Sequence, residues 1–311
     1  LIHIEDPESV VTSEEFFRRK TAVFEELAKT LHGHGGFLTI QPELEWITGA
    51  NAFMPGVPSQ LVKDYNVVYS THTHGPVCVD EQTGIPYGNK ACSRHPEWSP
   101  HITDDDVVTY IADRVDAIEA AANTTVTDHN GQWDWANFYL VEQAGIKTVA
   151  AYKYEQRSFD TLITNPWRPA QTPPKTDAEG YFVHDPDGPV IFLPGVGQSV
   201  SKYDERIDEE VSRYMAQYIA LADPDRVNTL YIVTHVDHFY SLNGQSPSHY
   251  IKYNAANGDM ALSPEFESHL AYWDDLLTDL VDPLVAGGYV QWASLPEMGE
   301  AYEEWEANCG S

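Results

Sequence analysis

The sequence predicts an α/β protein, a distorted (β/α)7-type barrel, and three observations favour this fold class. Short apolar runs alternate with helical patterns from end to end, which is typical of parallel strands with helices between them. Seven or eight such runs are present, and that number fits a closed barrel better than an open sheet. The length of 311 residues also fits, because closed α/β barrels often exceed about 250 residues as one unit. We expect one barrel domain over residues 1–311.

The predicted strands are short apolar runs bounded by turn residues. They cover residues 1–6, 37–42, 66–71, 124–129, 146–152, 190–193, 229–234 and 289–293. The first run resembles a strand and not a basic, apolar signal peptide, so we expect a processed or excised chain.

The predicted helices carry apolar residues at helical spacing and have recognisable starts. A capping box of Thr12 and Glu15 begins the first. Three aspartates at 104–106 begin another, because a helix N-terminus favours negative charge. Ser263 and Pro264 begin a long helix near the end. Further helices are expected at 135–144, 207–219 and 296–306, with loop excursions at about 75–103 and 165–189.

The charge balance excludes several classes of partner. Lys and Arg number 18 against 48 Asp and Glu, which gives a net charge of −30 at pH 7. Such a chain repels nucleic-acid phosphates and anionic lipid headgroups, so we expect neither as partner, and no apolar run is long enough to insert into a membrane. The charge suits high ionic strength, although an acidic protein secreted into ordinary media is the alternative.

Three cysteines are too few for a disulfide-built scaffold and too scattered for a cysteine-based zinc site. Cys78 and Cys92 bracket a turn-rich stretch, and they could pair if the protein is exported. Cys309 would then be left over. The alternative is three unrelated thiols.

Polar residues gather where the predicted strands end, which in a barrel is one common mouth. Glu5 and Asp6 follow the first strand, and His72 and His74 follow the third. His129 ends the fourth. One carboxylate with two or three imidazoles has the ligand count of a catalytic metal site, and this donor set favours zinc over calcium. We therefore expect a divalent metal held by Asp6 and His72, with His74 or His129 as the third ligand.

Other residues near the same mouth could act on a substrate. His235 and His238 could supply a general acid, with Asp237 orienting it, because imidazole titrates near neutral pH. A plain surface loop is the alternative for these three. Aromatic side chains could stack on sugar rings, although core packing is the better expectation for any one of them. The candidate substrate-binding residues are Trp133, Trp135, Tyr152 and Trp167.

These motifs resemble the polysaccharide deacetylase family, the NodB-like or carbohydrate esterase family 4 fold. Glu5-Asp6 stands where that family has two adjacent acids, and the run 70–74 looks like the start of its His-Ser/Thr-x-x-His motif. Pro76 stands where that motif has its second histidine. The family's Arg-Pro-Pro-Tyr segment is replaced by the run 128–131, so His74 or His129 must substitute as ligand.

The resemblance implies a metal-dependent hydrolase that removes N- or O-acetyl groups from an extracellular or cell-surface carbohydrate. In that family the metal polarises the acetyl carbonyl, a residue at the place of Glu5 is the base, and a late-strand histidine at the place of His235 or His238 is the acid. One alternative is a glycoside hydrolase that uses Glu5 with Asp128 or Asp237. The other is a silent barrel that binds carbohydrate or serves as a structural surface protein.

Overall fold

The computed structural model describes a large part of the chain. The described residues are 1–4, 13–73, 78–87, 92, 103–131, 138–150, 163–170, 183–199, 207–235, 251–254, 259–262 and 264–309.

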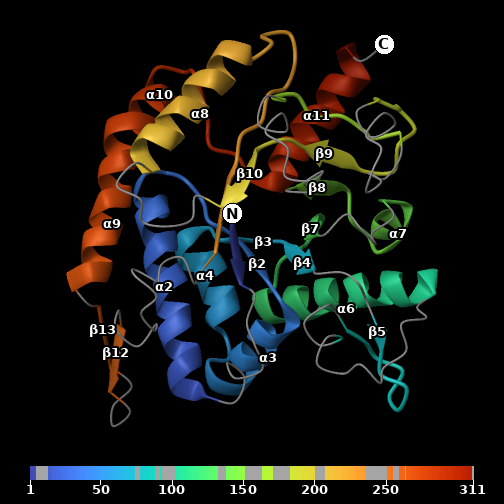
Figure 1. Ribbon diagram of the computed structural model, residues 1–311, viewed down its shortest axis with the longest axis vertical. Coiled ribbons are helices and arrows are strands. Elements are labelled where there is room, and N and C mark those ends of the chain that lie inside the picture. The colour runs from blue at the N-terminus through green and yellow to red at the C-terminus, as the bar shows by residue number, and fades with distance from the viewer. Residues whose placement is uncertain are drawn as a thin grey trace.

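Most described strands belong to two parallel sheets (Figure 1). The five-stranded sheet has the order β10 (Val196–Ser199), β11 (Ile232–His235), β1 (Ile2–Ile4), β2 (Thr39–Pro42) and β3 (Val68–Tyr69). The four-stranded sheet has the order β4 (Thr71–Thr73), β7 (Asp128–Gly131), β8 (Thr148–Ala150) and β9 (Ile191–Leu193). Two antiparallel hairpins pair β5 (Cys78–Val79) with β6 (Pro86–Tyr87), and β12 (Ile251–Asn254) with β13 (Asp259–Leu262).

Two stretches of chain contribute to both parallel sheets. In residues 68–73, β3 pairs with β2, and after Ser70 the chain continues as β4, which pairs with β7. In residues 191–199, β9 pairs with β8, and after Pro194 and Gly195 the chain continues as β10, which pairs with β11. The edge strands of one sheet therefore continue directly into the edge strands of the other.

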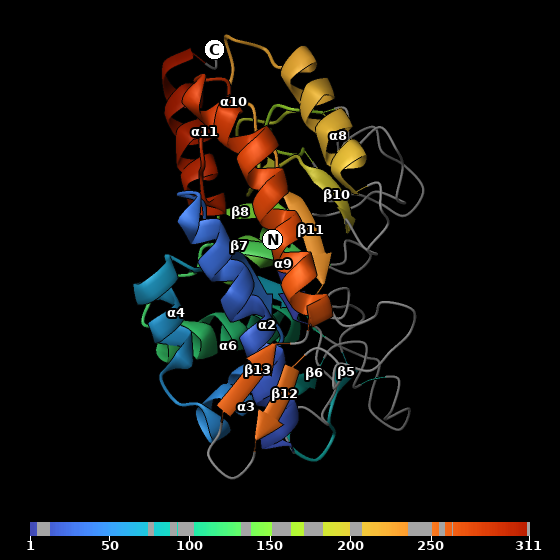
Figure 2. The same cartoon turned by 90° about the vertical axis from the view of Figure 1, so that its left-hand side faces the viewer.

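Helices lie around the strands, and Figure 2 shows α2 beside α9. Their bounds are α2 Glu14–Gly33, α3 Leu44–Phe53, α4 Val57–Tyr65, α6 Asp104–Ala122, α7 Phe138–Gln143, α8 Ile207–Leu221, α9 Pro264–Leu276, α10 Asp282–Ala286 and α11 Leu295–Cys309. A π-helical turn, η5 (Leu277–Val281), joins α9 to α10 just before Pro283, whose ring nitrogen cannot donate to the preceding turn. In the described part of the chain, no helix is long and apolar enough to cross a membrane.

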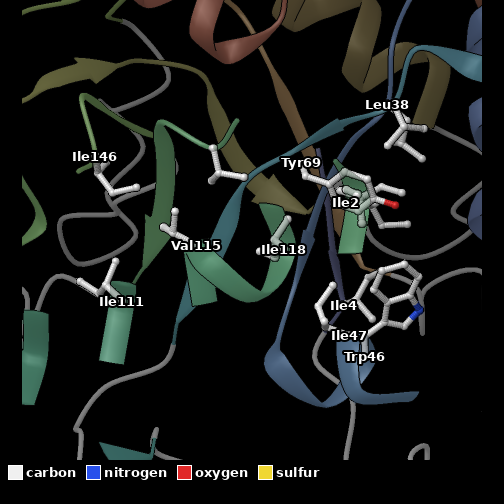
Figure 3. Packing of buried hydrophobic residues seen from close by; sticks show 14 of the residues in the cluster. Ile2, Ile4, Leu38, Trp46, Ile47, Tyr69, Ile111, Val115, Ile118 and Ile146 are labelled. Atoms are coloured by element: carbon white, nitrogen blue, oxygen red, sulfur yellow. The ribbon is translucent and has the colours of Figure 1, made fainter. Parts of the chain in front are cut away.

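The main core lies between the strands and these helices (Figure 3). Ile2 and Ile4 of β1 are fully buried and belong to one cluster with Trp46 of α3 and Ile111 of α6. Because side chains alternate along a strand, His3 between the two isoleucines faces the other way. We call the side of the sheets that carries Ile2 and Ile4 the outer face, and the opposite side the inner face.

A second apolar cluster covers part of the inner face. It joins residues of β8, β9 and β11 to α11, whose Leu295 and Tyr302 are almost fully buried. Gly299 of α11 lies so close to Thr148 of β8 that an added Cβ would clash with the Thr148 methyl carbon. Helix α11 therefore packs directly against the inner face beside β8.

The structure confirms one expectation and corrects others. Cys78 and Cys92 form a disulfide with their Cα atoms 5.7 Å apart, as the export hypothesis predicts, and Cys309 is free and exposed. Ser13 and not Thr12 caps α2, by accepting a hydrogen bond from the Phe16 amide.

Residues 289–293 form no strand, so the expected last strand is wrong. The Trp292 indole donates to the His34 carbonyl at 3.1 Å, and its ring lies where a Cβ on Gly36 would be. This segment therefore joins the protein through a side chain and not through a ladder of backbone hydrogen bonds. The sequence prediction also placed no element between residues 42 and 66, where α3 and α4 lie.

Candidate active site

A group of buried polar side chains lies on the inner face of β1, β2, β4 and β7, together with the Ser70 link between β3 and β4. Each member is at most 7% exposed, and the group consists of His3, Gln41, Ser70, His72, Asp128 and Asn130. Burying polar groups costs free energy unless they are hydrogen-bonded. A cluster of buried polar side chains on one face of the sheets is therefore a candidate functional site, and each of its members needs hydrogen-bond partners.

Strand register brings these residues together. His3 is the register partner of Gln41 in β2, and His72 is the register partner of Asn130 in β7. Register partners in parallel strands point to the same face, so each pair shares the inner face. Contacts between β2 and β4 place the two pairs side by side.

Hydrogen bonds link His3, Asn130, Gln41, Ser70 and Asp128 into one chain. The Asn130 amide nitrogen lies 2.6 Å from His3 Nε2 and 3.0 Å from Gln41 Oε1. The Gln41 amide donates to the Ser70 hydroxyl oxygen at 2.9 Å. The Ser70 hydroxyl in turn donates to the backbone carbonyl of Asp128 at 3.0 Å. The buried amides and the hydroxyl are thus all engaged.

The rings of His3 and His72 stack on each other. Their centroids are 4.1 Å apart and their planes differ by 24°. His72 is the middle residue of β4 and is only 3% exposed. The ring of His72, which precedes His74 by two residues in the chain, is therefore buried and packed against the ring of His3.

His129 does not join this pair. It lies on the outer face, where its Nδ1 is 2.6 Å from the Thr71 hydroxyl and its Nε2 is 3.3 Å from the Thr73 hydroxyl. Burial, together with smaller contributions from His72 and Arg114, lowers the pKa of His129 to about 3. The ring is neutral at physiological pH, and both of its nitrogens are already occupied. Of the two candidates for the third metal ligand, His129 is the one that the structure describes, and it lies on the outer face with its nitrogens next to Thr71 and Thr73.

Asp128 is fully buried at the start of β7. Among the described residues, neither of its carboxyl oxygens has a hydrogen-bond partner at good distance and angle, although the Ser70 hydroxyl lies nearby. Burial raises the pKa of Asp128 to about 7, and the nearby Ser70 hydroxyl only partly opposes this rise. The group is therefore largely protonated below neutral pH, unlike an ordinary surface aspartate.

The structure describes two of the other candidate residues, His235 and Trp167. The backbone of His235 ends β11 and is the register partner of His3. Trp167 is 9% exposed and belongs to the main core, with its ring 4.5 Å from that of Phe192, so it packs and does not form an open platform. The remaining candidates lie outside the described residues: Glu5, Asp6, His74, Trp133, Trp135, Tyr152, Asp237 and His238.

Within the described ranges, no three His, Cys, Asp or Glu side chains form a group that could hold a metal ion. Of the expected ligands, Asp6 and His74 lie beyond those ranges. His72 is described, and it is buried on the inner face.

Sequence reasoning missed His3, Gln41 and Asn130 as members of the site. One signal was available for His3, because it is the polar residue between two isoleucines in a short strand. Gln41 and Asn130 become recognisable only when the register of β1, β2 and β7 is known.

The fold is similar to that of a known structure. A crystal structure from Mycobacterium smegmatis, described as a candidate polysaccharide deacetylase, matches 93% of this chain and 79% of its own chain, with a TM-score of 0.50 and 10% identity. At that identity the match concerns the fold alone. No protein-family model and no curated protein matches the sequence. The α/β architecture with parallel sheets is thus consistent with a deacetylase-like fold.

Proposed function

We propose that this protein is a metal-dependent hydrolase that removes acetyl groups from an extracellular carbohydrate. The observation that carries the proposal is the buried His3–His72 pair on the inner face, beside the strand ends where Glu5, Asp6 and His74 follow. The fold, similar to that of a polysaccharide deacetylase candidate, gives the same expectation.

The strand pairings support a seven-membered (β/α) barrel. If residues 68–73 and 191–199 each count as one bent strand, the pairings pass from β1 through β2, 68–73, β7, β8, 191–199 and β11 back to β1. In such a barrel the carboxyl ends of the strands meet around one mouth, where active sites lie.

The donor set fits a zinc ion. Asp6, His72 and His74 would hold it, since two imidazoles and one carboxylate are typical ligands of a catalytic zinc site with an open position. The buried, ring-stacked His72 supplies one preset donor of this set. When bound, the ion would polarise the acetyl carbonyl and lower the pKa of a coordinated water.

The chain's own residues would move the protons. Glu5 would accept the proton of the attacking water, and His235 or His238 would donate one to the leaving amine or alcohol. Asp237 would orient the donor. Trp133, Trp135 and Tyr152 would present flat apolar faces to the sugar rings.

An extracellular location is part of the proposal. The Cys78–Cys92 disulfide supports it, because disulfides persist in oxidising compartments and are rare in the cytosol. The net charge of −30 supports a saline surrounding, where the self-repulsion of acidic groups is screened.

Two substitutions at adjacent positions test the proposed roles. Asp6→Ala should lose both zinc and activity, because it removes one of three protein ligands. Glu5→Gln should keep the zinc and reduce acetate release by about 10²-fold or more, because only the base is lost. Zinc content and acetate release from acetylated oligosaccharides are the two measurements.

The exposed acids Asp105 and Glu304 provide matched controls as Asp105→Ala and Glu304→Gln, which should leave both measurements unchanged. If Glu5→Gln hydrolyses as fast as the unmodified protein, Glu5 is not the base. Cleavage of glycosidic bonds without acetate release would indicate a glycoside hydrolase instead.

A further inference from the structure

We propose that His3 is a positioning residue that fixes the ring of His72 by stacking against it. The proposal rests on the proposed function only in giving His72 the role of metal ligand. Three observations support it: the direction of the hydrogen-bond chain behind His3, the ring stack itself, and the burial of both side chains.

The direction of the hydrogen-bond chain is set at its far end. The Ser70 hydroxyl lies 3.0 Å from the Asp128 carbonyl oxygen, which can only accept, so the hydroxyl proton points there. The Ser70 oxygen must then accept from the Gln41 amide, which leaves Gln41 Oε1 to accept from the Asn130 amide at 3.0 Å. Amide orientation in Gln41 and Asn130 is thus assigned from the network.

This direction determines the role of His3. The second amide proton of Asn130 is directed at His3 Nε2, 2.6 Å away, so His3 accepts at that nitrogen. If the chain ran in the opposite direction, the Ser70 hydroxyl would donate to Gln41 and not to the Asp128 carbonyl. The buried Ser70–Asp128 hydrogen bond would then be lost. His3 is therefore held in one ring orientation by strand β7, across the inner face from its own strand.

The fixed ring of His3 then restrains His72. The two planes are 24° from parallel with centroids 4.1 Å apart, so rotation of His72 about its side-chain bonds would lose the stack. His3 is 7% exposed and His72 is 3% exposed, which leaves little solvent to replace that contact. Partners that orient a ligating histidine typically change metal affinity by about 10- to 100-fold.

Two substitutions of His3 separate the stack from the hydrogen bond. His3→Phe keeps a flat ring against His72 but cannot accept from Asn130. His3→Gln can accept from Asn130 but has no ring. His3→Asn is a third variant, which likewise has no ring and carries an amide that can face Asn130. It keeps the test available if His3→Gln does not fold.

The first measurement uses the protein without metal. The nuclear relaxation of the ¹³C-labelled His72 ring, assigned through His72→Asn, reports whether that ring is held. We expect a rigid ring in the unmodified protein and in His3→Phe, which keep the stack, and a mobile ring in His3→Gln and His3→Asn, which lose it. A role in overall stability alone would lower the melting temperature and leave the ring of the folded protein rigid.

The second measurement is zinc affinity, determined by competition with a chelating dye. We expect His3→Phe to bind within about 3-fold of the unmodified protein, and His3→Gln to bind about 10-fold or more weakly. A rigid His72 ring and unchanged zinc affinity in His3→Gln, or in His3→Asn if His3→Gln is unfolded, would overturn the proposal. If the unmodified protein binds no zinc, the proposed function fails, and the relaxation measurement alone decides the role of His3.

Discussion

Asp128 illustrates what burial does to a single residue of this site. Its carboxyl group is fully buried, and its pKa is raised from 3.8 to about 7. Sequence reasoning placed Asp128 at a strand end and treated it as one possible acid of a glycoside hydrolase. The raised pKa could not be predicted, because it depends on which neighbours exclude water from the carboxyl group. The same holds for His3 and Asn130, whose contact spans 127 positions of the sequence.

Asp128 should make the protein less stable as the pH rises. The folded state holds its proton up to about pH 7, whereas the unfolded state releases it near pH 3.8, so the free energy of unfolding falls between these values and is level above them. At about 1.4 kcal/mol per pH unit, the loss is about 4 kcal/mol.

Asp128→Asn should remove that part of the pH dependence and be the more stable form at pH 8. Urea unfolding of both proteins between pH 4 and pH 8 measures the difference. Parallel curves for the two proteins would show that Asp128 titrates normally.

The elements differ in how far the sequence predicts them. Helices α2 and α6 are predictable because they combine apolar spacing with a cap, and α6 has the full capping box of Thr103 and Asp106. Helices α3 and α4 were missed, since Gly49, Gly56 and Pro58 interrupt the segment and resemble loop signals. Helix α4 uses two of them: Gly56 is the left-handed residue before it, and Pro58 lies in its first turn.

His34 connects the end of α2 to the C-terminal helices. Its Nδ1 lies 2.8 Å from an Asp282 carboxyl oxygen, and its Nε2 lies 3.1 Å from one of Asp274. Burial alone would lower the pKa of His34, but the two carboxylates outweigh burial and raise it. When the ring is protonated, its two ion pairs hold the end of α2 to α9 and α10.

Because the pKa of His34 is higher in the folded state, the ion pairs stabilise the protein below about pH 6.5 and lose their effect as the pH rises through the raised value. Asp282→Asn should lower the melting temperature at pH 5.5 and have little effect at pH 9. Both carboxylates are exposed, so we expect at most about 1 kcal/mol. Thermal melts of the variant and of Asp279→Asn as control, at both pH values, give the comparison. A loss of equal size at both pH values would contradict the ion-pair account.

At the scale of the whole molecule, the alternation of short apolar runs with helical patterns predicted the α/β class and parallel sheets, both of which the structure shows. The continuity of residues 68–73 and 191–199 between the sheets could not be predicted. It depends on where each strand changes partner, at Ser70 and at Pro194-Gly195. The net charge of −30 is a property of the whole chain and is independent of these details.

The whole-molecule charge predicts that stability rises with salt. Thirty uncompensated negative charges repel one another in the folded state, and added ions screen this repulsion. The melting temperature should increase from low to molar NaCl. Melts at matched ionic strength in NaCl and KCl would separate screening from effects of a particular ion. A melting temperature that is flat or falls with salt would contradict the prediction.

The central claim is that a metal at the strand ends enables the protein to release acetate from a carbohydrate. The most direct test is acetate release from acetylated oligosaccharides by the unmodified protein, first after chelation and then after zinc is returned. We expect no release after chelation and recovery with about one zinc per chain. Acetate release that is unaffected by chelation would contradict the metal-dependent mechanism, and no release from any acetylated glycan with zinc present would contradict the deacetylase assignment itself.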